Sequence, residues 1–170
     1  MSITRAAWPA LAVAALLSLP LTASPAAAQG AVVATYGDWE MRCDTPPGAQ
    51  FEQCSLFQWV QAENRDNIGL VTLVVKTADQ AAQLMRVVAP LGILLPAGMG
   101  LTIDGEQVGR AEFIRCQVEG CYVEILLEEE LLEQLEGGET AEFTIFAVPE
   151  EGIVVPISLA GFSEGFAALP

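Results

Sequence analysis

The chain is built mostly from short segments rich in branched and aromatic residues, and turn residues separate these segments. Such a rhythm is typical of antiparallel β proteins, because each segment is long enough for a strand and too short for most helices. The sequence therefore predicts a mainly β, single-domain antiparallel sandwich or partly open barrel. The expected strands are residues 35–44, 53–62, 68–76, 83–89, 101–103, 106–108, 112–118, 121–127, 140–148 and 153–159.

One turn and one helix are predicted more strongly than the other elements. Asp104-Gly105 supplies the positive φ angles that a two-residue hairpin turn requires, so the strands on either side should pair. Residues 128–130 are three glutamates that suit a helix N-terminus, and the leucines at 131, 132 and 135 form one apolar stripe. Gly137-Gly138 should end this one short helix. Residues 161–169 form either a second short helix or an irregular tail.

The segment Leu91 to Leu95 is apolar and lies between Pro90 and Pro96. Prolines and glycines here favour an irregular connection, which we expect to be buried in the core. The alternative is that the segment shapes an apolar groove.

The first 28 residues are typical of a secretory signal peptide. Arg5 precedes an apolar run over residues 6–19, which is shorter than the roughly 20 residues of a membrane-spanning helix. Small residues then lead to a cleavage site between Ala28 and Gln29. We therefore expect an exported domain over residues 29–170 with no transmembrane segment, located in the periplasm or secreted.

All four cysteines follow this segment, and an even number of cysteines in an exported chain indicates disulfides. We favour the pairs Cys43–Cys54 and Cys116–Cys121, because each pair is close in sequence and flanks a turn-rich stretch. A zinc site and a redox-active pair are the alternatives. Neither spacing is that of a two-residue metal knuckle or of a Cys-x-x-Cys motif.

Composition excludes several functions. The chain has no histidine, so it cannot form a Ser-His-Asp or Cys-His site or a histidine-ligated metal centre. With 22 acidic and 7 basic residues, the formal net charge of -15 argues against binding nucleic acid or anionic lipid. We expect no cofactor, no metal and no catalytic residues.

Several aromatic and charged residues invite a functional interpretation. Trp39 and Trp59 could form an aromatic platform for a ligand, but their alternating neighbours favour core packing for both. Phe162 and Phe166, four residues apart, should seal the core or an edge. Lys76 should lie at the edge of a strand.

A series of motifs in fixed order resembles a known family. The motifs are Tyr36-Gly37-Asp38-Trp39-Glu40-Met41-Arg42-Cys43, Cys54 with Gln58, residues 90–98 (PLGILLPAG), Ile103-Asp104-Gly105, Cys116 with Gly120-Cys121, and Leu159-Ala160-Gly161-Phe162. This order resembles the invasion-associated locus B family of exported bacterial proteins. The resemblance implies a disulfide-bonded, mostly β envelope protein, and the family offers no catalytic residues to carry over.

These observations favour a non-catalytic protein that binds another protein of the envelope or of a host cell. The host-cell role follows from the resemblance, because the founding member of the family is linked to entry into red cells. The acidic balance favours a partner with basic patches, and the loops at residues 46–48 and 91–100 would present the contact surface. Two alternatives remain open. One is a periplasmic carrier or chaperone for a small apolar molecule, and the other is a hydrolase of glycans that uses two carboxylates.

Overall fold

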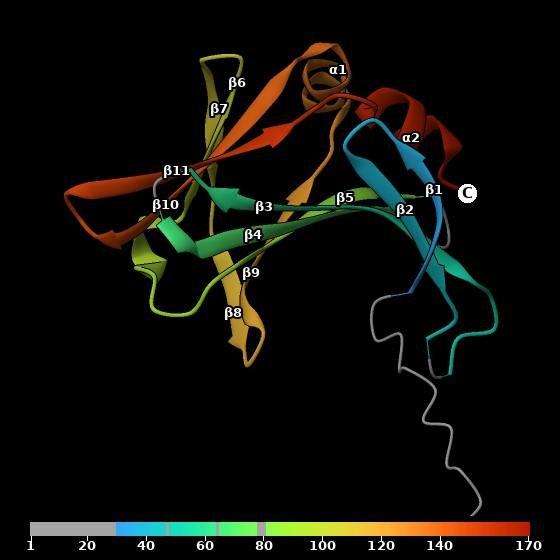
Figure 1. Cartoon of the computed structure of the whole chain (residues 1–170), viewed down its shortest axis with the longest axis horizontal. Coiled ribbons are helices and arrows are strands. Elements are labelled where there is room, and N and C mark those ends of the chain that lie inside the picture. The colour runs from blue at the N-terminus through green and yellow to red at the C-terminus, as the bar shows by residue number, and fades with distance from the viewer. Residues whose placement is uncertain (1–29, 47, 64, 78–80) are drawn as a thin grey trace, which may run out of the picture.

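The structure is a computed structural model that describes residues 30–46, 48–63, 65–77 and 81–170. The proposed signal peptide, including Ala28 and Gln29, lies outside the described residues. The described residues form two antiparallel sheets, two α-helices and a 3-10 turn (Figure 1). Neither sheet closes into a barrel, so of the two predicted architectures the structure has the open, sandwich-like one.

The larger sheet has seven strands in the order β1-β2-β3-β4-β5-β9-β8, and every neighbouring pair is antiparallel. Most neighbours in this sheet are also consecutive in the chain, because short turns connect them. The strands are β1 (Ala31–Tyr36), β2 (Trp39–Asp44), β3 (Gln53–Ala62), β4 (Arg65–Lys76), β5 (Gln83–Ala89), β8 (Phe113–Gln117) and β9 (Gly120–Leu126).

The smaller sheet has four strands in the order β11-β10-β6-β7. These strands are β6 (Met99–Ile103), β7 (Glu106–Ala111), β10 (Thr140–Val148) and β11 (Glu151–Ser158). Asp104 and Gly105 form the predicted hairpin turn, and both have positive φ angles. The 3-10 turn η1 (Leu95–Ala97) precedes β6.

The helix α1 (Glu129–Gly137) lies where the sequence predicts it, and Leu135 on its apolar stripe is fully buried. Residues 162–168 form a second helix, α2 (Phe162–Ala168), rather than an irregular tail. Phe162 and Phe166 are buried and stack with ring centroids 5.9 Å apart, as expected for residues that seal the core. Figure 1 shows both helices on the same side of the molecule.

The core fills the space between the two sheets. Inward residues of both sheets are fully buried, among them Leu56, Val74, Val87, Phe143 and Ile145. Alternate residues of β2, β3, β4, β5 and β9 point into this core, so the residues between them form the opposite, outer face of the larger sheet.

Two expectations about local structure were wrong. Residues 35–44 form a hairpin and not one strand, because Gly37 adopts a positive φ angle of 54° between β1 and β2. The apolar stretch before η1 is irregular, as predicted, but it is not buried throughout. Leu91 and Leu95 are exposed, while Ile93 packs partly buried against the core.

Candidate functional site

The four cysteines form two disulfides, Cys43–Cys54 and Cys116–Cys121. Each disulfide joins residues that are directly opposite each other on neighbouring strands, β2 with β3 and β8 with β9. The first disulfide therefore closes the base of the β2–β3 loop. The second closes the β8–β9 hairpin next to its turn.

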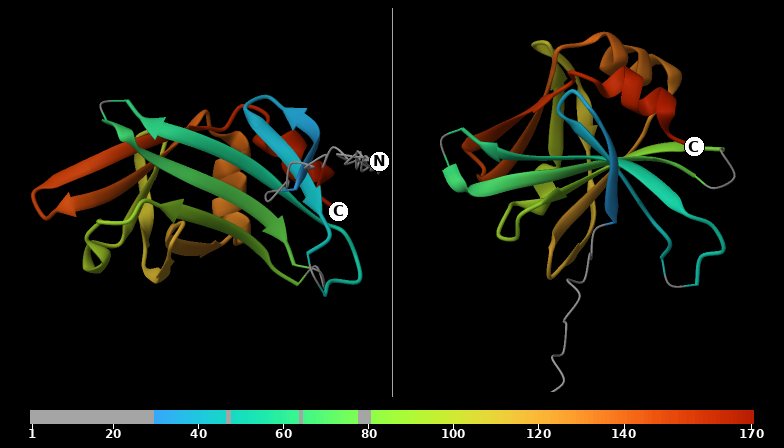
Figure 2. Two further views of the ribbon diagram at one scale, coloured as in Figure 1. Left: turned by 60° about the horizontal axis from the view of Figure 1, so that its bottom comes forward. Right: turned by 45° about the vertical axis from the view of Figure 1, so that its right-hand side comes forward.

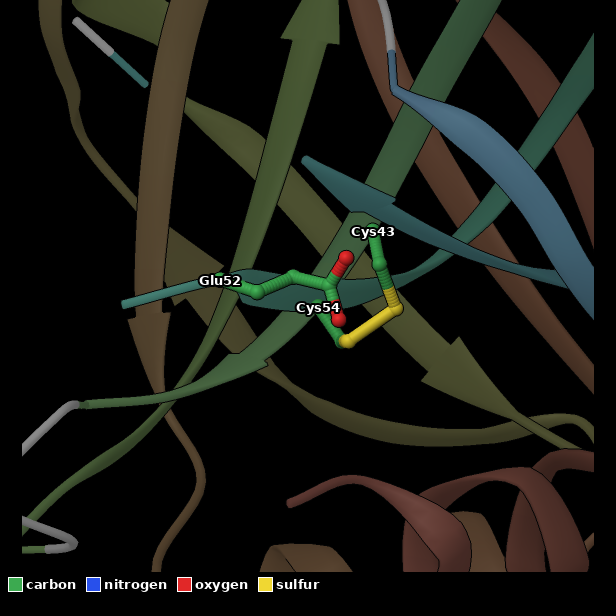
Figure 3. Close-up of side chains that lie close together, drawn as sticks. All are labelled: Cys43, Glu52 and Cys54. Carbon is green, nitrogen blue, oxygen red and sulfur yellow. A yellow bond between two sulfur atoms is a disulfide. The ribbon is translucent and has the colours of Figure 1, made fainter. Parts of the chain in front are cut away.

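Glu52 brings a carboxylate to the Cys43–Cys54 disulfide, as Figure 3 shows, and the carboxylate and sulfur atoms all lie within 4.8 Å of one another. Metal ions bind cysteine as the thiolate. Both sulfur atoms here are bonded to each other, so the oxidised protein offers only one ionised ligand at this place. We do not assign a metal site to it.

Several motifs of the sequence converge at one structural junction between the sheets. The Gln58 side chain donates from Nε2 to the Ser158 carbonyl and accepts at Oε1 from the Ser158 amide, both at 3.1 Å. The indole of Trp39 donates to the same carbonyl at 2.9 Å. These contacts join the larger sheet to β11, so the motif residues here have a structural role.

Two glycines allow the backbone to pass closely at the same junction. A Cβ atom on Gly161 would lie 2.2 Å from the Tyr36 carbonyl oxygen, and one on Gly37 would lie 2.2 Å from the Ala160 carbonyl oxygen. The Asp38 amide also donates to the Ala160 carbonyl at 3.0 Å. The glycines in these two motifs are therefore required by sterics.

The outer face of the larger sheet is unusually apolar for a sheet with only one covered side. Such sheets normally alternate apolar residues inward with polar residues outward. Here one cross-strand row consists of Trp59, Val71, Val88 and Tyr122, and Arg115 of β8 ends it. The row crosses five strands without an acidic residue.

A second row on the same face runs from Glu40 through Phe57, Leu73 and Arg86 to Glu124. A third contains Val75, Leu84 and Leu126. We call the outward residues of these three rows the outer face. Figure 2 (left) shows β3, β4 and β5 of this face turned toward the viewer, with both helices behind them.

Trp59 lies on this face, and the prediction that it packs in the core was wrong. Its side chain is 55% exposed, whereas Trp39 is fully buried. The indole lies against Gly69 of β4, where an added Cβ atom would be 3.1 Å from the Trp59 Nε1 atom. The glycine therefore makes room for a large aromatic ring held against the sheet surface.

The charges on the outer face are balanced, unlike those of the chain as a whole. Arg86 donates to Glu124 at 2.6 Å, and Arg42, on the outward side of β2, donates to Glu40 at 2.7 Å. Arg42 also lies over the Phe57 ring, 3.6 Å from its centroid. Within the three rows, Arg86 and Arg115 balance Glu40 and Glu124, and Arg42 lies beside these rows.

Three loops extend the exposed apolar surface beside the outer face. The β2–β3 loop, the β5–β6 connection and the β8–β9 turn all project away from the helices (Figures 1 and 2). Each carries exposed large apolar side chains: Phe51, Leu91 with Leu95, and Val118. Both loops expected to form a contact surface are in this group. The β8–β9 turn and the outer face were not predicted from the sequence as part of this surface. Their residues are far apart in the chain, and only strand pairing brings them together.

A polar depression lies beside β11, between residues of β3 and β4 and residues of the smaller sheet. Ala62, Glu63, Arg65, Glu142 and Glu151 line part of a volume of about 330 Å³ beside β11, and Arg65 is ion-paired with Glu151. Of the three glutamates in this depression, Glu151 is therefore engaged in an ion pair. None of the helices in the described part of the chain is long and apolar enough to cross a membrane.

The fold and these surfaces define a class: a disulfide-bonded protein of two open β-sheets with an exposed, charge-balanced apolar face. The model of the invasion associated locus B protein family matches residues 39–170, and the chain belongs to this family. Family membership and the two disulfides indicate a protein that functions outside the cytoplasm.

A solved structure supports the same fold. The crystal structure of invasion associated protein B from Bartonella henselae is similar over 79% of this chain and 91% of that one, with a TM-score of 0.66 and 22% identity. At this identity the likeness concerns the fold alone. The search of curated proteins found no match.

Proposed function

We propose that this protein is an exported, non-catalytic binding protein, in the periplasm or secreted, and that it contacts another protein through the outer face. The observation that carries the proposal is the apolar row from Trp59 to Tyr122, in which Trp59 is 55% exposed and Val71, Val88 and Tyr122 are partly exposed. Contiguous exposed apolar patches on soluble proteins mark interaction sites. Arginine and aromatic residues, which are abundant on this face, are enriched in protein interfaces.

The face of the sheet suits a protein partner better than its edges do. Both edge strands of the larger sheet have a shift of register, near Val33 in β1 and near Ile114 in β8. Irregular edges discourage pairing with a further strand. Side-chain contacts on the outer face are therefore the better route to a complex than an added strand.

Charge adds a second property of the partner. Exposed acidic residues lie at the ends of strands of the larger sheet: Asp44 ends β2, and Glu112 immediately precedes β8. A protein with an apolar centre and basic patches around it complements this arrangement, because opposite charges at a rim speed association and select the partner. The partner can belong to the bacterial envelope or to a host cell, and the family name directs attention to the second.

The packing between the sheets favours binding over transport of a small molecule. A carrier needs a cavity between its layers, and in this protein fully buried side chains such as Leu56 and Phe143 occupy that space. The hydrolase alternative has less support: of the three glutamates in the depression beside β11, Glu151 is ion-paired with Arg65.

Site-specific photocrosslinking in intact cells tests the proposal. Benzoylphenylalanine replaces Trp59 on the outer face or, as a control, Val154 on the smaller sheet, which is 45% exposed. We expect one recurrent protein to be captured from position 59 and not from position 154. Equal capture from both positions, or none from position 59, would contradict the proposal.

A further inference from the structure

Each of the two disulfides lies at the base of a projecting segment that carries an exposed apolar residue. The Cys43–Cys54 disulfide closes the loop that contains Phe51, which is 78% exposed. The Cys116–Cys121 disulfide closes the hairpin whose turn contains Val118, which is 88% exposed. These are the two most exposed large apolar side chains in the described part of the chain.

We infer that Phe51 and Val118 are the anchor residues of the complex, and that they enter two apolar pockets of the partner, each bordered by basic residues. This inference rests on the proposed function, because the anchors would act beside the outer face. Both segments project on the side away from the helices, so one partner can contact both of them and the sheet (Figure 2, right).

The chemistry of the pockets follows from the neighbours of each anchor. Glu52 follows Phe51 and Glu119 follows Val118, and both glutamates are exposed. No basic residue lies within two positions of either anchor in the sequence. An apolar pocket with an arginine or lysine at its rim therefore matches each pair, and an acidic rim would repel both. The same glutamates disfavour insertion of the two tips into the apolar part of a membrane.

The disulfides explain how such exposed anchors can bind well. Ordering a flexible loop on binding costs conformational entropy, and a disulfide across the base of the loop reduces that cost. Anchors that fill a pocket at an interface account for most of the binding energy. Each disulfide thus has a role in binding in addition to its effect on the stability of the fold.

Crosslinking from the loop positions tests the inference. Benzoylphenylalanine replaces Phe51 or Val118, and the outer-face position 59 and the control position 154 are run alongside. We expect positions 51, 118 and 59 to capture the same protein. Mass spectrometry of the crosslinked peptides should locate apolar residues of the partner beside arginine or lysine.

Variants then measure the contribution of each anchor. With the captured partner purified, Phe51→Ser and Val118→Ser should each weaken binding about tenfold or more, and Val154→Ser should change it less than twofold. The double variant Cys116→Ala/Cys121→Ala should weaken binding while its circular dichroism spectrum stays native. Because both anchors are exposed, the serine variants should fold normally.

The possible failures are distinguishable. If position 59 captures a protein but positions 51 and 118 do not, the anchors are wrong and the outer face remains the contact surface. Crosslinks from 51 and 118 to lipid, or to partner sites without basic residues, would overturn the inference about pockets. If none of the three positions captures a protein, both the inference and the proposed function fail.

Discussion

The side-chain amide of Gln58 makes a reciprocal pair of hydrogen bonds with the backbone of Ser158, one hundred residues further along the chain. The Gln58 side chain thereby bonds both the N–H and the C=O of Ser158 in β11, as the backbone of a neighbouring strand would. It also donates to the Asp38 carbonyl at 3.1 Å, so one side chain connects three segments of the fold.

Replacing this glutamine should destabilise the protein strongly. Gln58→Leu fills a similar volume but leaves the Ser158 amide and the Asp38 carbonyl without their side-chain partner at a part-buried place. Unsatisfied groups of this kind cost about 1–3 kcal/mol each, so we expect a loss of about 2–4 kcal/mol in the free energy of unfolding. Urea denaturation measures it. Gln107→Leu, at an exposed position of β7, is the matched control and should change stability by less than about 0.5 kcal/mol.

Comparison with Gly105 separates two reasons for a glycine at position 161: the close approach of other backbone and the positive φ angle. Gly161 and Gly105 share a φ angle of 84°, but only at Gly161 would a Cβ atom meet backbone, whereas nothing lies within 4 Å at Gly105. Gly105→Ala should therefore cost only the strain of a positive φ angle, about 1 kcal/mol. Gly161→Ala should cost far more and prevent stable folding at 37 °C. Similar melting temperatures for the two variants would refute the steric argument.

Asp104 should stabilise the junction between α1 and β10. Its carboxylate accepts hydrogen bonds from the amides of Glu139 and Thr140 at 2.9–3.1 Å, and its φ angle is 49°. Asp104→Ala removes these bonds and worsens the strain, so we expect a loss of about 2 kcal/mol. Asp104→Asn keeps an acceptor and tolerates the positive φ angle, so it should lose less than half of that. Thermal unfolding of the three proteins compares them directly.

Glu52 should slow reduction of the disulfide beside it. A thiolate that attacks Cys43–Cys54 approaches the Glu52 carboxylate, and two like charges 4 Å apart repel by about 1 kcal/mol in water. Glu52→Gln should therefore speed reduction of this disulfide by dithiothreitol by up to about fivefold. Alkylation and mass spectrometry follow both disulfides, and Cys116–Cys121 serves as the internal control. An unchanged rate at low salt would contradict the electrostatic explanation.

Of the three tryptophans, Trp39 and Trp59 should differ sharply in solution, and protein without residues 1–28, which contain Trp8, allows the two to be compared. Acrylamide should quench the fluorescence of Trp59, which is half exposed, and leave that of Trp39 almost unaffected. In the protein without residues 1–28, Trp59→Phe should accordingly remove nearly all of the quenchable emission without a loss of stability. If Trp59→Phe left the quenching unchanged, the indole at position 59 would not be on the surface.

Trp59 also shows where prediction from the sequence fails. In the order Leu56-Phe57-Gln58-Trp59, alternation places two of these side chains on each face, and the polar amide suggests that Gln58 faces solvent. In the structure Gln58 is buried and Trp59 is exposed. The Gln58 side chain bonds the backbone of Ser158 in β11, and alternation then places Trp59 on the outer face. The partners are a hundred residues away, so no local pattern reveals them.

The sequence by itself determined the local elements: the strands, the Asp104-Gly105 turn, the helix α1 and the close spacing that favoured the two disulfide pairs. These depend on neighbours a few residues apart, through turn geometry, helix periodicity and short loop closure. Only the tertiary structure decided which side of β3 is buried and which exposed residues lie together. Phe51, Trp59 and Val118 are far apart in the chain, and the order of strands in the larger sheet brings them to one side of the molecule.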